Sequence, residues 1–220
     1  QAGDGPGKGL LAANKGQIED GGYLARNCLG LAYAEREEWP KAIPAFVLAA
    51  EGAEAADDER AGIFWSQAGN AAFAGGDHGA ALKYFGSALA QDTLDGLLKG
   101  EVHLDMARVY VSMDQYDQAK AQFVLVHELV PEDPLGWLLS ATLARRMGDF
   151  ALAKSDIAVA AKLAITDPAI ALEAGNIAYE AGDVANAKIN WEQAVKFGPD
   201  SPSARAATRY LEQLAASVEE

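Results

Sequence analysis

The chain has 220 residues, half of them hydrophobic, and its 32 acidic and 18 basic side chains give a formal net charge of −14. Because proteins bind phosphates mainly through Lys and Arg, this balance disfavours nucleic acid or an anionic membrane surface as a partner. The sequence contains no run of about 18 apolar residues, so it predicts no transmembrane helix. The single cysteine excludes an internal disulfide. The chain begins with Gln1, which fits a trimmed chain or a mature form that has lost an export signal, and we favour an exported or periplasmic protein over a cytoplasmic one.

The first 22 residues are expected to lie outside the repeated part of the chain. Residues 1–9 are rich in Gly and Pro and predict an irregular tail. Residues 10–18 predict a short helix that covers the exposed end of the first repeat, and Gly21 and Gly22 end it.

A repeated pattern follows. Five amphipathic runs each open on an alanine, at steps of 39, 38, 34 and 34 residues: Ala42, Ala81, Ala119, Ala153 and Ala187. Four residues later each run has a large apolar side chain: Phe46, Phe85, Phe123, Ile157 and Trp191. Twelve residues before the alanine, an earlier helical run has a small residue: Gly30, Gly69, Ala107, Ala141 and Gly175. Two helices approach to about 8 Å where one presents Gly or Ala and the other a large side chain, so each run pair predicts a helical hairpin.

These columns resemble the tetratricopeptide repeat family. The resemblance implies an all-α, right-handed α–α superhelix, a solenoid of five helix–turn–helix repeats with a C-terminal capping helix. The expected repeats are 23–56, 62–95, 100–133, 134–167 and 168–201, and the cap is 202–220. Glu37 and Asp114 depart from the family pattern at the glycine of the turn, and Ile165 departs at the terminal proline.

Two local features modify the regular repeat. Pro44 lies inside the second helix of the first repeat and cannot donate a hydrogen bond to Pro40, which predicts a kink or a late start of that helix. Leu94, Leu97 and Leu98 keep a helical apolar face before the third repeat, so we expect its first helix to begin about one turn early.

No catalytic constellation emerges, and we expect neither an enzyme nor a cofactor or metal site. His78 occupies a packing position at a turn, and His103 and His127 lack a third ligand at metal-binding spacing. We interpret Cys28 as a buried, inert thiol. Residues 57–59 form a charge run for which solvation is favoured over weak calcium binding.

In the family that the columns resemble, the first helices of successive repeats line a concave groove that contacts peptides. Equivalent positions on successive first helices form rows along this groove. Aligning the five repeats places the following candidate partner-binding residues in or beside these rows: Asn27, Asn70, Phe73, Arg108, Leu138, Thr142, Arg145, Arg146, Leu172, Asn176 and Tyr179. Asn side chains can both donate to and accept from a peptide backbone, and the leucines could form an apolar floor.

The three arginines of these rows admit two interpretations. They could bind a carboxylate of the partner, or they could pair internally, Arg108 with Asp105 and Arg146 with Glu180. The Lys and Asn clamp with which some family members hold a C-terminal carboxylate is absent, because the matching positions are Asn27, Leu31, Gln67, Glu101 and Asp105.

The resemblance therefore implies a non-catalytic interaction scaffold that binds a peptide or protein, with a carboxylate as one option for the bound group. Two alternatives stay open: a self-association module that forms a homodimer, and a docking segment of a larger enzyme.

Overall fold

The computed structural model describes residues 22–216, which contain α-helices and no β-strand. The covering helix expected at residues 10–18 lies outside these described residues. The described chain forms two compact units that divide between Met113 and Asp114.

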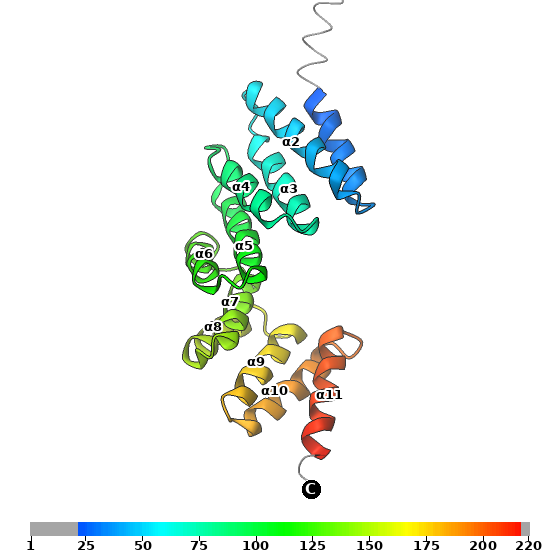
Figure 1. Ribbon diagram of the computed structural model, residues 1–220. Coiled ribbons are helices and arrows are strands. Elements are labelled where there is room, and N and C mark those ends of the chain that lie inside the picture. Colours follow the sequence, from blue (N-terminus) through cyan, green and yellow to red (C-terminus); the bar gives the residue numbers. More distant parts are fainter. Residues whose placement is uncertain (1–21, 217–220) are drawn as a thin grey trace, which may run out of the picture. The chain divides into compact units, whose positions relative to one another are not determined.

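The first unit is a series of helices in which each packs on the next (Figure 1). Its elements are the helical segment 22–34, α2 (Trp39–Ala55), α3 (Ala61–Ala74), α4 (His78–Leu89) and α5 (Gly96–Ser112). Helix α5 also contacts α3, so first helices of successive hairpins are neighbours within this unit.

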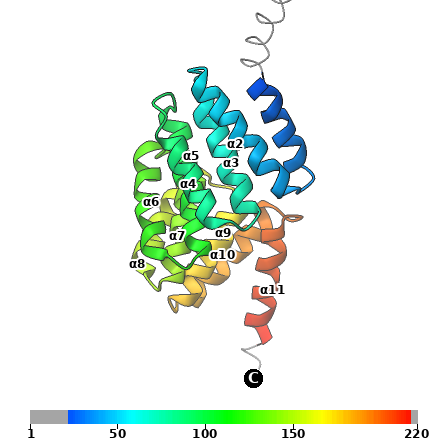
Figure 2. The same cartoon turned by 45° about the horizontal axis from the view of Figure 1, so that its top comes forward.

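The second unit repeats the arrangement with α6 (Tyr116–Leu129), α7 (Pro134–Arg146), α8 (Phe150–Leu163), α9 (Pro168–Glu180), α10 (Val184–Phe197) and α11 (Pro202–Ala216). Consecutive helices pack together, and α7 contacts α9 as α9 contacts α11. Figures 1 and 2 both show α9, α10 and α11 side by side. Because α7, α9 and α11 are alternate helices, they share one face of the unit.

The repeat columns form the core, as the sequence predicts. The five opening alanines have no exposed surface, and the large side chains four residues later are at most 7% exposed. A Cβ atom placed on Gly69 would lie 2.5 Å from the Phe85 ring, and one on Gly175 would overlap the Trp191 ring. Glycine therefore lets each aromatic side chain lie directly on the backbone of the facing helix.

The turns explain two of the three departures from the family pattern, those at Glu37 and Asp114. Gly76, Gly148 and Gly182 adopt φ values of 75° to 83°, and Glu37 and Asp114 adopt the same left-handed conformation at 56° and 57°. This conformation costs a residue with a side chain about 1–2 kcal/mol. The hairpins thus keep one turn geometry and accept backbone strain where glycine is absent.

Helix boundaries confirm one local prediction and correct another. Helix α5 begins at Gly96, one turn early, with the Asp95 carboxylate accepting from the Leu98 amide at 2.8 Å. Helix α2 begins at Trp39 and runs through Pro44, so the late start is wrong, and the kink stays a prediction. An N-terminal proline suits the first turn because its missing amide hydrogen has no helical partner there.

Helix α11 occupies the place of one more first helix. Ala204 and Ala207 are buried in the unit. Its exposed Arg205, Arg209 and Glu212 fall 34 residues after Ala171, Gly175 and Ala178, the positions at which α9 packs on α10. A charged face at these positions does not accept a further apolar helix, which is the property of a cap.

Candidate functional site

The expected partner-binding residues all lie on first helices of hairpins and divide between the two units. The first unit holds Asn27, Asn70, Phe73 and Arg108, and the second holds Leu138, Thr142, Arg145, Arg146, Leu172, Asn176 and Tyr179. Each unit has a pocket on this face.

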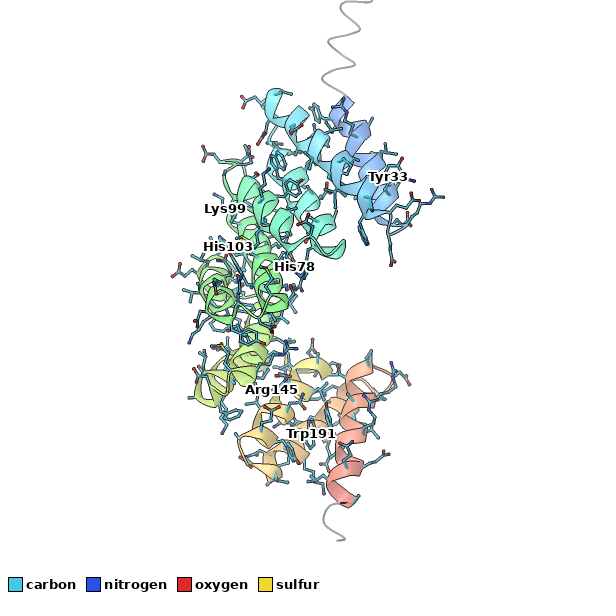
Figure 3. The ribbon with its side chains drawn as sticks, viewed as in Figure 1. Tyr33, His78, Lys99, His103, Arg145 and Trp191 are labelled. Atoms are coloured by element: carbon cyan, nitrogen blue, oxygen red, sulfur yellow. The ribbon has the colours of Figure 1, made fainter. Side chains whose placement is uncertain are left out.

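The pocket of the second unit, which we call the aromatic pocket, has a volume of about 350 Å³. It brings together three expected residues, Arg145, Asn176 and Tyr179. Its other lining residues are Glu180, Trp191, Tyr210, Gln213 and Leu214. The lining comes from α7, α9, α10 and α11, and Figure 3 labels Arg145 on α7 and Trp191 on α10.

Arg145 is held by two carboxylates within the unit. Its Nε donates to Glu173 Oε1 at 2.6 Å, and its Nη1 donates to Glu180 Oε1. Burial alone would lower the pKa of Arg145, but hydrogen bonds and charges from both glutamates outweigh burial and raise it above the ordinary value. The guanidinium is therefore charged at all working pH values and already paired. The sequence suggested an internal pair between Arg146 and Glu180, and in the structure Arg145 makes this pair.

Three aromatic rings form one wall of the aromatic pocket. The Trp191 ring centroid lies 5.5 Å from that of Tyr179 and 5.2 Å from that of Tyr210, with tilted planes. Trp191 is 3% exposed, whereas Tyr179 and Tyr210 are 50% and 39% exposed. Trp191 Nε1 donates to Asn176 Oδ1 at 3.1 Å, which fixes the central ring.

The remaining expected residues of the second unit serve packing more than the open face. Leu138 and Leu172 are half-buried against apolar core clusters, so each presents only part of its side chain, and their role as an apolar floor stays a prediction. The Thr142 hydroxyl donates to the Leu138 carbonyl at 2.9 Å. Arg146 is exposed.

The pocket of the first unit, which we call the apolar pocket, measures about 320 Å³. It includes the expected Asn70 and is otherwise lined by Leu31, Ala34, Trp39, Phe46, Gln67, Ala71 and Ala74. Phe73 lies outside this lining and packs against the His78 ring at 5.7 Å.

Two buried acceptors lie on the same helices as the apolar pocket. Asn27 Oδ1 and Gln67 Oε1 are buried and have no hydrogen-bond donor among the described residues. An unsatisfied buried polar group costs about 1–3 kcal/mol. Both oxygens therefore carry an uncompensated desolvation cost within the described chain.

Other candidate groups of the first unit have structural partners. Arg108 donates to Asp105 at 2.9 Å, as the internal-pairing interpretation expects. His78 Nε2 lies 3.2 Å from the Ser112 hydroxyl. Asp58, from the acidic run, accepts from Arg60 and Tyr23, and these hydrogen bonds hold its pKa well below its usual range. Cys28 is exposed, so the interpretation of a buried thiol is wrong.

Within residues 22–216 no group of three or more His, Cys, Asp or Glu side chains is arranged to hold a metal ion. Over the same range, no helix has the length and apolar character needed to cross a membrane.

Sequence reasoning missed Trp191, Tyr210 and Gln213 as site residues. It assigned Trp191 to core packing alone and α11 to capping alone. A signal was present, because Tyr210 and Gln213 follow Asn176 and Tyr179 by the 34-residue period. Extending the rows by one period would have found them.

Residues 72–143 match a family model described as the tetratricopeptide repeat. The comparison with curated proteins finds no match.

Several solved structures share the fold. YrrB, a TPR protein with an unusual peptide-binding site, is 18% identical, with a TM-score of 0.64 over 89% of this chain and 97% of that chain. MamA from Desulfovibrio magneticus is 14% identical, with a TM-score of 0.68 over 82% and 97%. The first TPR of Spaghetti (RPAP3), solved with an HSP90 peptide, is 20% identical, with a TM-score of 0.52 over 58% and 98%. At these identities the likeness establishes the fold alone.

Proposed function

Because this chain is a tetratricopeptide-repeat protein, we propose that it is a non-catalytic scaffold that binds a peptide segment of a partner protein along the first helices of its hairpins. The observation that carries the proposal is the aromatic pocket, where side chains of four helices converge on a cavity rather than fill it. YrrB and the Spaghetti domain, which share the fold, are peptide-binding proteins by description.

The expected residues take different roles in this function. In the first unit Asn70 bonds the peptide backbone at the apolar pocket, and Asn27, Phe73 and Arg108 on the first helices border its path. In the second unit Tyr179 supplies the main contact area, because it is half exposed and rigidly backed by Trp191. Exposed aromatic side chains of this kind are the residues that dominate binding energy in protein interfaces.

The partner contacts at the remaining positions are secondary. Thr142 and Arg146 lie on α7, which also contributes Arg145 to the aromatic pocket. Leu138 and Leu172 are half-buried and offer only part of their side-chain surface. A carboxylate of the partner would have to compete with Asp105 for Arg108 and with two glutamates for Arg145.

Selection from a display library of random twelve-residue peptides tests the proposal. We expect enriched peptides whose affinity falls about tenfold or more in the variant Tyr179→Ala, since anchor residues contribute more than about 1.4 kcal/mol. Ile189→Ala is the matched control, because Ile189 is also 50% exposed but lies on the second helix α10 outside the pocket.

Failure to enrich any peptide, or equal binding by Tyr179→Ala and the wild type, would reject the groove as the binding site. Sedimentation velocity on the same samples addresses the alternative. A dimer at micromolar concentration that dissociates in the Tyr179→Ala variant would assign this face to self-association.

A further inference from the structure

Resting on the proposed function, we propose that the aromatic pocket takes the basic side chain of a lysine or arginine from the bound peptide. The cationic group lies against the exposed rings of Tyr179 and Tyr210, which the buried Trp191 backs, with Glu180 as its counter-charge.

The aromatic wall favours a cation. The faces of Tyr and Trp rings carry negative potential and attract an ammonium or guanidinium group within about 6 Å of the ring centroid. The accessible rings here are those of Tyr179 and Tyr210, and the buried Trp191 lies between them at centroid distances of 5.5 and 5.2 Å. Its hydrogen bond to Asn176 holds the ring in place, so a ligand would meet a wall that is already formed.

The charges of the pocket also favour a cation. Arg145 is the basic group of the lining, and its guanidinium donates to both Glu173 and Glu180. Two carboxylates around one guanidinium leave an excess of one negative charge. The Glu180 side chain is 42% exposed, so it can accept from a ligand while it keeps Arg145. The net charge of −14 strengthens the preference over long range.

The same pairing argues against an anionic ligand. A partner carboxylate would compete for Arg145 with both glutamates, of which Glu173 is 8% exposed, with its carboxylate held at 2.6 Å. Loss of that pair would leave a charge buried without compensation, which is strongly destabilising.

The size of the pocket matches one long side chain. Its volume of about 350 Å³ lies at the small end of ligand pockets. Leu214 adds an apolar surface for the methylene stem, which Lys and Arg bury while their charged end stays polar.

Four versions of one peptide test the inference. The peptide is the tightest binder from the display selection, with Lys, Arg, norleucine or Glu at its anchor position, and binding is measured by titration calorimetry. We expect Lys and Arg to bind about threefold to thirtyfold more tightly than norleucine, which matches the apolar stem but lacks the charge. Glu should bind weakest.

Protein variants locate the effect. Glu180→Gln and Tyr210→Leu should each weaken the Lys peptide about threefold or more, and Glu180→Gln should leave norleucine binding unchanged. Glu192→Gln is the matched control, because it removes the same charge from an exposed residue of α10 outside the pocket. Unchanged helicity shows that each variant is folded, and unchanged norleucine binding adds the same control for Glu180→Gln.

The outcomes separate this inference from the proposed function. Peptides that bind and are lost in Tyr179→Ala, but that prefer norleucine or Glu at the anchor, would uphold the scaffold and overturn the basic-side-chain assignment. Absence of any bound peptide would overturn both. A Lys preference that is lost in Glu180→Gln and kept in Glu192→Gln supports both.

Discussion

The two units use the same core and present different chemistry on the same face. In each, a glycine on a first helix lets an aromatic ring lie on its backbone, as Gly69 does for Phe85 and Gly175 for Trp191. The apolar pocket of the first unit combines apolar side chains with the amides of Gln67 and Asn70, whereas the aromatic pocket of the second contains a guanidinium and a carboxylate. The buried positions that recur in every repeat therefore determine the hairpin, whereas the residue types on the exposed face of the first helices differ between the units.

The largest difference between the units should appear in their ion pairs. Glu173→Ala removes a buried carboxylate from Arg145 and should destabilise the protein by about 3 kcal/mol, because it leaves a partly buried charge without its main partner. Asp105→Ala breaks the Arg108 pair, whose guanidinium is 43% exposed, and should cost less than about 1 kcal/mol. Urea unfolding monitored by circular dichroism measures both. Equal losses would contradict the contrast between a buried and an exposed pair.

The shared core predicts the opposite result, a similar effect in both units. Gly69→Ala and Gly175→Ala should each destabilise by about 1–3 kcal/mol, because the added methyl group overlaps an aromatic ring that has no room to move. Gly86→Ala in α4 is the matched control, since its Cβ would meet nothing within 4 Å. There the same change should raise stability by about 0.5–1 kcal/mol through helix propensity. A melting temperature that falls for only one of the two variants, Gly69→Ala or Gly175→Ala, would contradict the equivalence of the units.

The smallest effect is a pH dependence that belongs to the second unit. Burial lowers the pKa of His127, which stacks on Trp137 with centroids 3.6 Å apart, and the charge of Asp156 opposes this only in part. The unfolded chain binds a proton near pH 6.5 and the folded chain binds it only at lower pH. Stability from this group is therefore complete above about pH 6.5 and is lost as the pH falls.

Urea midpoints measured between pH 7 and pH 5 check this expectation. The variant His127→Phe keeps an aromatic ring for the stack and should show a shallower decline than the wild type. An identical decline in both proteins would assign the pH dependence to other groups.

The sequence was sufficient for the features that repeat. The opening alanines, the large side chains four residues later and the small residues of the first helices all lie in the core, because a column that recurs five times reports packing shared by all hairpins. Even the early start of α5 followed from the phase of Leu94 and Leu98. Helical periodicity encodes both the face and the length of such elements.

The site was predicted only in part because its chemistry does not repeat. Asn176 and Tyr179 were found through their rows, but the bond from Trp191 to Asn176 joins a packing position to a row position. Glu173 was missed for a similar reason. A carboxylate on a helix is expected to be solvent-exposed, and the sequence does not indicate that Arg145, 28 residues away, contacts and covers it. Leu138 and Leu172 are only partly exposed, since each also packs against a core cluster formed by its own hairpin and the following helix.

The charged face of α11 bears on how copies of this protein meet in concentrated solution. A head-to-tail contact between identical subunits is heterologous, and unless its rotation closes a ring it grows into an open filament. Stacked helical hairpins are exposed to this hazard wherever a helix presents an uncovered apolar packing face. Arg205, Arg209 and Glu212 place three charges where such a contact would need small apolar residues. Replacing them with Ala, Gly and Ala, the residues of α9, would give this face of α11 the packing surface that α9 offers to α10.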